Sequence, residues 1–274
     1  MKQQILGFIG AGNMAASLIG GLIADGYPAD QIWVSDIHED ALTSLLERYG
    51  VHVSTRNAIV VEHAQILVLA VKPQVLRAVV EELAPIIQAR QPLVVSIAAG
   101  ITAGSIERWA GGDAAVVRCM PNTPALVRTG ATGLYANVRV GEEQRSQAEA
   151  ILRAVGLTVW VGDEILLETV TALSGSGPAY IFLFMEAMEE AGVALGLDRE
   201  TARLLGQQTV LGAGRIAIES AESPAELRRR VTSPGGTTER AIATFEEGKL
   251  RELVAKAMQA AARRAAELAK QLGA

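Results

Sequence analysis

Residues 5–15 read ILGFIGAGNMA, and this stretch decides the fold. An apolar run typical of a strand ends at Gly10, and apolar residues at helical spacing follow from Asn13 to about Asp25. Gly10 permits a tight turn, and Gly12 lets the backbone approach a pyrophosphate at the positive end of the helix. The sequence therefore predicts a dinucleotide-binding turn made by Gly10, Ala11, Gly12, Asn13 and Met14.

Strands and helices alternate along the next part of the chain. Apolar runs predict strands at 32–36, 66–71, 93–97, 116–119, 133–137 and 157–161. Amphipathic spacing predicts helices at 41–49, 57–64, 75–87, 105–109 and 142–155. Because the strands are continuous apolar runs, we expect an α/β fold, a Rossmann-type doubly wound sheet that is mostly parallel and covered on both faces.

The strand pattern stops near residue 162, and residues 164–273 read almost entirely as helix. Within this region, residues 180–185 are apolar on every side, so a helix there must be buried all round. A region of this size is most easily covered by a partner subunit. We therefore predict a dinucleotide-binding domain at 1–162 and an all-α dimerisation and substrate domain at 163–274, in an obligate homo-oligomer.

Composition limits the classes of function. The net charge of −5 argues against nucleic acid as a partner, since phosphate binding needs a basic face. No apolar run approaches the roughly 20 residues of a membrane span, and no leader is expected. A lone cysteine, Cys119, fits a core residue in a cytoplasmic protein better than a nucleophile. The three histidines, His38, His52 and His63, lack metal-ligand spacing, so no metal site is expected.

The choice between NADH and NADPH rests on the end of the second predicted strand. Asp36 stands where a carboxylate would bind a ribose 2′-hydroxyl and repel a 2′-phosphate, which favours NADH. Ser35, Arg56 and Asn57 could instead meet a 2′-phosphate. Both cofactors remain open at this point.

A second anion site is predicted at residues 233–238, Ser-Pro-Gly-Gly-Thr-Thr. The glycine pair lets the backbone turn, and Thr237 and Thr238 open the next helix, which together suit a carboxylate. An ordinary turn with a threonine cap is the alternative.

A third motif, residues 174–178, reads Ser-Gly-Ser-Gly-Pro within an apolar helical context. Glycine and proline break helices. Either another backbone or the cofactor approaches closely here, or the helix is kinked to shape the oligomer.

Six motifs in order resemble the pyrroline-5-carboxylate reductase family over essentially the whole chain. They are residues 8–15 (FIGAGNMA), 70–73 (AVKP), 96–100 (SIAAG), 118–124 (RCMPNTP), 173–180 (LSGSGPAY) and 231–238 (VTSPGGTT). The resemblance implies reduction of 1-pyrroline-5-carboxylate to L-proline by NADPH or NADH, the last step of proline biosynthesis. It also implies a homodimer, often assembled into a decamer.

The resemblance also assigns site residues. Asn57 would lie near the adenosine ribose. The cofactor would be lined by Ala70, Val71, Lys72 and Pro73 and by Ile97, Ala98 and Ala99. The substrate would be held by Ser233, Gly236, Thr237 and Thr238. Glu164 falls at the position of a substrate-proximal glutamate, and Arg230 at a position near the cofactor.

Two residues are the candidates for catalysis. The Thr238 hydroxyl would hydrogen-bond the ring nitrogen of the imine, orienting it or relaying a proton from water, because threonine is too weak an acid to donate a proton itself. Glu164 would favour the iminium ion electrostatically.

Three other functions stay in view. A hydroxyacid dehydrogenase usually needs a lysine or histidine in its helical part, and the lysines there, at 249, 256 and 270, lie outside the glycine-rich motifs. A reductase of a related cyclic imino acid and a non-catalytic dinucleotide-binding protein are the others.

Overall fold

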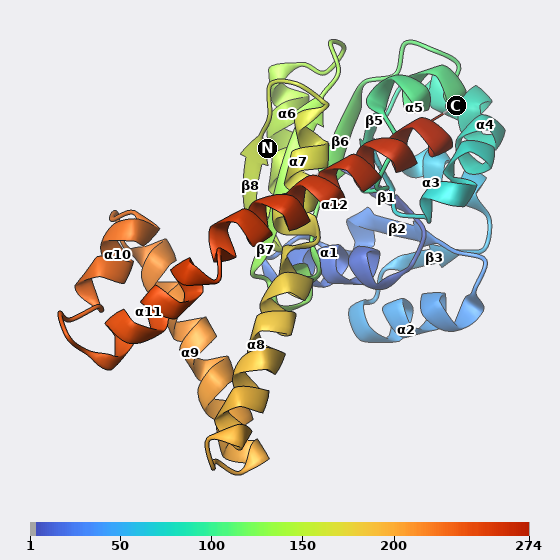
Figure 1. Ribbon diagram of the computed structural model, residues 1–274. Helices are drawn as coiled ribbons and strands as arrows, with labels where there is room; N and C mark the ends of the chain where they lie inside the picture. Colours follow the sequence, from blue (N-terminus) through green and yellow to red (C-terminus); the bar gives the residue numbers. More distant parts are fainter. Residues whose placement is uncertain (1–3, 274) are drawn as a thin grey trace. The chain divides into compact units, whose positions relative to one another are not determined.

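The computed structural model describes residues 4–273, which form two compact units. The first unit comprises the chain up to Ser176 together with the residues from Ala260 onward, and the second comprises Gly177–Gln259 (Figure 1). Their extents differ from the division at 1–162 and 163–274, because residues 163–176 and the end of the last helix group with the sheet. The functional division at 162 stays a prediction.

The first unit contains one eight-stranded sheet in the order β3-β2-β1-β4-β5-β6-β7-β8. The strands are β1 (Leu6–Ile9), β2 (Ile32–Ser35), β3 (His52–Ser54), β4 (Ile66–Leu69), β5 (Leu93–Ser96), β6 (Val116–Met120), β7 (Gly130–Ala136) and β8 (Gly156–Trp160). Only the β6–β7 pair is antiparallel. This is the doubly wound order in which ligands bind between β1 and β4, so the predicted fold class is confirmed.

Helices cover both faces of this sheet, and each face has its own core. On β4, Ile66 and Val68 belong to one core while Leu67 and Leu69 belong to the other, as the period of two in a strand requires. One core includes side chains of α1 (Asn13–Ala24), α2 (Glu39–Tyr49) and α6 (Glu142–Arg153). The other includes side chains of α3 (Asn57–His63), α4 (Pro73–Arg90) and α5 (Ala103–Trp109).

The lone cysteine and two of the histidines have structural roles in this unit. Cys119 is buried on β6, and burial raises the pKa of its thiol well above the usual range, which confirms a core residue rather than a nucleophile. The rings of His52 and His63 stack on Trp33, with centroid distances of 4.3 and 3.9 Å.

The chain after β8 is helical, as predicted. The first unit adds α7 (Leu166–Val170) and a π-helical turn, Thr171–Gly175. The second unit contains α8 (Gly177–Ala194), α9 (Arg199–Glu219), α10 (Pro224–Arg230), α11 (Thr237–Glu247) and the start of α12 (Leu250–Leu272). Asp198 and Ser223 cap α9 and α10 by accepting backbone N–H groups, which explains where these helices begin. Among residues 4–273, no helix is both long and apolar enough to cross a membrane.

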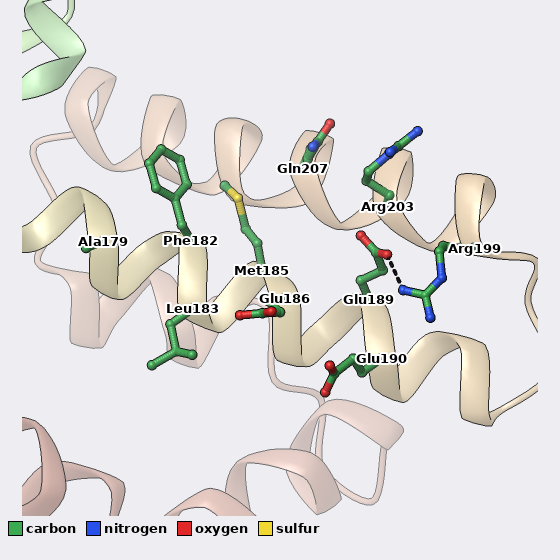
Figure 2. Close-up of a pocket in the computed structure, with 10 residues that line it drawn as sticks. All are labelled: Ala179, Phe182, Leu183, Met185, Glu186, Glu189, Glu190, Arg199, Arg203 and Gln207. Atoms are coloured by element: carbon green, nitrogen blue, oxygen red, sulfur yellow. Dashed lines mark hydrogen bonds and ion pairs between the residues drawn. The ribbon is translucent and has the colours of Figure 1, made fainter.

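The apolar segment at 180–185 is not covered within its own unit. Phe182 and Leu183 on α8 are 63% and 66% exposed. They border a hollow of about 590 Å³ along α8 and α9, where Glu189 and Arg199 form an ion pair of 2.7 Å (Figure 2). A row of exposed aromatic and aliphatic side chains is typical of a surface that another subunit covers.

Candidate active site

The glycine turn lies at the carboxyl end of β1. Gly10 has φ +105°, and a Cβ there would lie 2.7 Å from the carbonyl oxygen of Ala70, so only glycine fits. Gly12 precedes α1, and a Cβ there would meet no atom within 4 Å. No side chain caps this end of α1, and its first turn carries no acidic residue. The first N–H groups of α1 therefore face open space, as a pyrophosphate site requires.

Asp36 follows β2 and contacts this turn. One carboxylate oxygen accepts the N–H of Ala11 at 2.7 Å, and the other accepts the backbone N–H and Nδ1 of His38 at 2.9 and 2.8 Å. Burial alone would raise the pKa of Asp36, but these hydrogen bonds outweigh burial and lower the pKa below its usual value. Asp36 is therefore an ionised carboxylate beside the glycine turn, as binding of a ribose hydroxyl requires.

Ser35 has a different position from the one expected. Its side chain is fully buried, and its hydroxyl donates to Oδ1 of Asn57 at 2.8 Å. Asn57 is the first residue of α3 and is half-buried, while Arg56, just before that helix, is exposed. Ser35 therefore orients Asn57 rather than offering its hydroxyl to a 2′-phosphate, because burial removes it from the surface where the ribose would lie.

The loops after β4 and β5 lie at the same edge of the sheet as the glycine turn. The N–H of Ala70 donates to Ile9 at 2.8 Å, and the N–H of Ile97 donates to Leu69 at 3.2 Å. Lys72 precedes α4, and Pro73 is its first residue, where a missing N–H costs nothing. The predicted cofactor residues of β1, β2, β4 and β5 are thus brought together at the switch point of the sheet.

Glu164 lies between β8 and α7 and makes two contacts within the first unit. Its Oε1 accepts the N–H of Ala103 at 2.7 Å and a guanidinium N–H of Arg118 at 3.2 Å. Arg118 on β6 is only 4% exposed, and the Glu164 side chain is 22% exposed. Sequence reasoning missed this pair, although a single charged residue within the apolar strand Val116–Met120 was the available signal.

Residues 233–238 form a turn that leads into α11. Gly235 has φ +71°, and its N–H donates to Glu239 at 2.7 Å, while the N–H of Gly236 donates to Ser233 at 3.0 Å. The N–H of Gly236 is thus used within the turn in this structure, and the part that Gly236 plays in substrate binding stays a prediction. Thr237 and Thr238 are exposed in the first turn of α11, which no side chain caps, so their N–H groups face outward.

The motif at 174–178 follows the π-helical turn. A Cβ on Gly175 would lie 2.7 Å from the side-chain end of Met120, and Asn122 donates to the carbonyl of Ser174 at 2.9 Å. The glycine thus permits close approach of Met120 at the end of β6, and π-turns frequently mark functional sites.

Comparisons with known proteins agree with this architecture. A family model described as pyrroline-5-carboxylate reductase dimerisation matches residues 164–268, and one described as NADP oxidoreductase coenzyme F420-dependent matches residues 5–100. The pyrroline-5-carboxylate reductase of Pseudomonas aeruginosa is 54% identical over 273 residues, covering 100% of both chains. The chain belongs to the pyrroline-5-carboxylate reductase family.

Solved structures of this family superpose on the chain. A pyrroline-5-carboxylate reductase from Coxiella burnetii has a TM-score of 0.95 and 51% identity, covering 97% of this chain and 99% of that one. A Plasmodium falciparum pyrroline carboxylate reductase, solved with NADP bound, has a TM-score of 0.85 and 27% identity, covering 98% and 99%. The resemblance carried by the six motifs is confirmed, and the match at 164–268 supports a homo-oligomer.

Proposed function

We propose that this chain reduces the C=N bond of 1-pyrroline-5-carboxylate to give L-proline, the last step of proline biosynthesis. The observation that carries the proposal is the uncapped glycine turn at residues 10–12, at the switch point of a sheet in a chain of this family. NAD(P)H, when bound, supplies the hydride. The protein's own residues bind and orient the dinucleotide and the substrate, and they exclude water from the reacting atoms.

The dinucleotide site consists of the residues that share the carboxyl edge of the sheet. The α1 amides and the turn would hold the pyrophosphate, and Asp36 and Asn57 the adenosine ribose. The full set is Gly10, Ala11, Gly12, Asn13, Met14, Asp36, Asn57, Ala70, Val71, Lys72, Pro73, Ile97, Ala98 and Ala99, with Ser35 supporting Asn57.

Substrate binding is assigned to residues 233–238. The substrate carboxylate would accept the outward N–H groups of Thr237 and Thr238, with Ser233 beside them and Gly236 supplying the turn. The Thr238 hydroxyl would hydrogen-bond the ring nitrogen, which takes up a proton when hydride adds to the carbon. The electrostatic role of Glu164 toward the iminium ion stays a prediction.

The preference between NADH and NADPH is assigned to two residues with opposite effects, Asp36 and Arg56. The ionised Asp36 favours NADH, and the exposed Arg56 next to Asn57 favours NADPH. Use of both cofactors is therefore proposed, with Asp36 limiting the affinity for NADPH.

The oligomeric state and the cellular location of the protein are proposed as well. Residues 163–274 form the dimerisation and substrate domain, and dimers assemble into a decamer. The single cysteine is buried and free, which fits a reducing compartment, and the proposed location is the cytoplasm.

A spectrophotometric assay tests the proposal. The purified chain is given 1-pyrroline-5-carboxylate with NADPH and, separately, with NADH, and a six-membered cyclic imino acid serves as the competing substrate. We expect dinucleotide consumption matched by proline formation, faster with the five-membered ring. Dinucleotide binding without turnover would instead indicate a non-catalytic binding protein, and faster turnover of the larger ring would reassign the substrate.

A further inference from the structure

The loop at residues 97–102 connects β5 to α5 and carries three of the proposed dinucleotide contacts. Its beginning is tied to the sheet, because the N–H of Ile97 donates to Leu69 at 3.2 Å and that of Ala98 donates to the hydroxyl of Ser96 at 3.3 Å. Gly100 in its middle has φ +75°. Gly100 therefore turns the loop, the buried Ile101 anchors its side chain in the core, and the backbone has a second tie at its far end.

That second tie is Glu164. The far end of the loop enters α5, whose first N–H groups have no partner within the helix. The hydroxyl of Thr102 accepts the N–H of Ser105 at 3.1 Å, and the carboxylate of Glu164 accepts the N–H of Ala103 at 2.7 Å. The cap and the carboxylate thus fix different N–H groups of the same helical turn.

Arg118 holds the carboxylate in this position. It lies on β6 directly beside Ser96, the last residue before the loop, and is 4% exposed. A buried guanidinium needs an anion, and Arg118 donates to Oε1 of Glu164 at 3.2 Å, the same oxygen that accepts from Ala103. One oxygen therefore connects β6, the start of α5 and the segment that precedes α7.

We propose that Glu164 is a positioning residue that, clamped by Arg118, holds the loop at 97–102 in the shape that binds the nicotinamide dinucleotide. The proposal rests on the proposed function for the identity of that dinucleotide. It places the main effect of Glu164 on cofactor affinity, whereas a charge acting on the iminium ion would change the chemical step.

Three variants test the proposal. Glu164→Ala removes both contacts, whereas Glu164→Gln keeps an oxygen for the N–H of Ala103 but loses the charge that faces Arg118. Glu107→Gln is the matched control, because Glu107 also lies on α5 and pairs with Arg139 at 2.6 Å, away from the loop. For each variant, NADPH affinity is measured by fluorescence titration, KM for NADPH and kcat by steady-state kinetics, and the melting temperature by calorimetry.

We expect NADPH affinity to weaken about tenfold in Glu164→Ala and about threefold in Glu164→Gln, and to stay within about twofold in Glu107→Gln. KM for NADPH should rise in the same order, while kcat at saturating NADPH changes less. Because both Glu164 variants leave the buried Arg118 without its anion, their melting temperatures should fall. Graded rescue of NADPH affinity by glutamine, measured well below those temperatures, separates positioning from general loss of structure. If Glu164→Ala fails to fold, the comparison of the two glutamine variants decides.

Two results overturn the proposal. One is an equal fall in kcat for Glu164→Ala and Glu164→Gln with unchanged NADPH affinity, since this indicates a direct charge effect on the substrate. The other is equal weakening of NADPH affinity in Glu107→Gln, since any ion pair on α5 would then suffice. A wild-type chain that binds NADPH without reducing 1-pyrroline-5-carboxylate would defeat the proposed function, and the titrations would still decide the role of Glu164.

Discussion

The turns at residues 10–12 and 233–238 have nearly the same local geometry. Each contains a glycine that directly precedes a helix without a side-chain cap, Gly12 with φ −70° and ψ 176° and Gly236 with φ −82° and ψ 171°. Their surroundings differ. The first turn leaves a strand that is at most 1% exposed at Leu6, Phe8 and Ile9, whereas α10 and α11 around the second turn bury no residue within the described chain.

The difference shows that an anion site is a local property, while its rigidity depends on what packs around it. The glycine turn is held by a sheet with a core on each face, so packing on both sides keeps the turn rigid. The second turn lies among helices whose apolar side chains are exposed in the single chain, and we expect another subunit to cover them. The two turns should therefore respond differently to substitution.

The largest effect is expected from alanine at the glycine turn. Gly10→Ala places a Cβ 2.7 Å from a carbonyl oxygen at φ +105°, which should destabilise the fold by about 1–3 kcal/mol and abolish dinucleotide binding. Gly12→Ala meets no atom within 4 Å, so the melting temperature should stay unchanged while dinucleotide affinity falls about tenfold or more. Calorimetry and fluorescence titration measure both. Equal melting temperatures for the two variants would contradict the strain argument.

Thr238→Ala tests the second turn. We expect kcat/KM for 1-pyrroline-5-carboxylate to fall about 10- to 100-fold with dinucleotide affinity nearly unchanged, because the lost hydrogen bond concerns the substrate. Thr244→Ala is the control, since its hydroxyl donates to the carbonyl of Arg240 within α11. Unchanged turnover in Thr238→Ala would remove this hydroxyl from the mechanism.

Asp36→Asn tests whether Asp36, in the first unit, sets the preference between NADH and NADPH. Removing the charge should raise the ratio of kcat/KM for NADPH to that for NADH about tenfold, since the carboxylate would no longer repel a 2′-phosphate. Parallel kinetics with both cofactors measure the ratio. A ratio that stays at the wild-type value would indicate that Arg56, and not Asp36, sets the cofactor preference.

The smallest effect is the pH dependence of stability at Asp36. Its pKa is lower in the folded chain than its usual value, so its contribution is present at neutral pH and is lost as the pH falls through the folded pKa, below about pH 4. The difference in melting temperature between wild type and Asp36→Asn should therefore shrink on acidification. A difference in melting temperature that grows below pH 4 would contradict a lowered pKa of Asp36 in the folded chain.

Much of the first unit could be predicted because its cause is local. Continuous apolar strands and helical spacing predicted the doubly wound sheet, and Gly10 and Gly12 predicted the turn. The short edge strand His52–Ser54 is not among the predicted strands, because it has no continuous apolar run: one of its three residues is exposed and two are only partly buried. The burial of Ser35 could not be predicted, because a serine at a strand end faces either the surface or a neighbour such as Asn57.

The sequence by itself determined the fold class, the glycine turn and the helical second half, since these follow from residue periodicity and from backbone conformations that few residues adopt. Only the tertiary structure decided the partners of Glu164. Arg118, Ala103 and Glu164 lie far apart in the chain, and their contact arises from the order of strands β5 and β6 and the path back from β8. At the glycine turn, the sequence placed Asp36 near the ribose, and the structure added that its carboxylate also holds the N–H of Ala11.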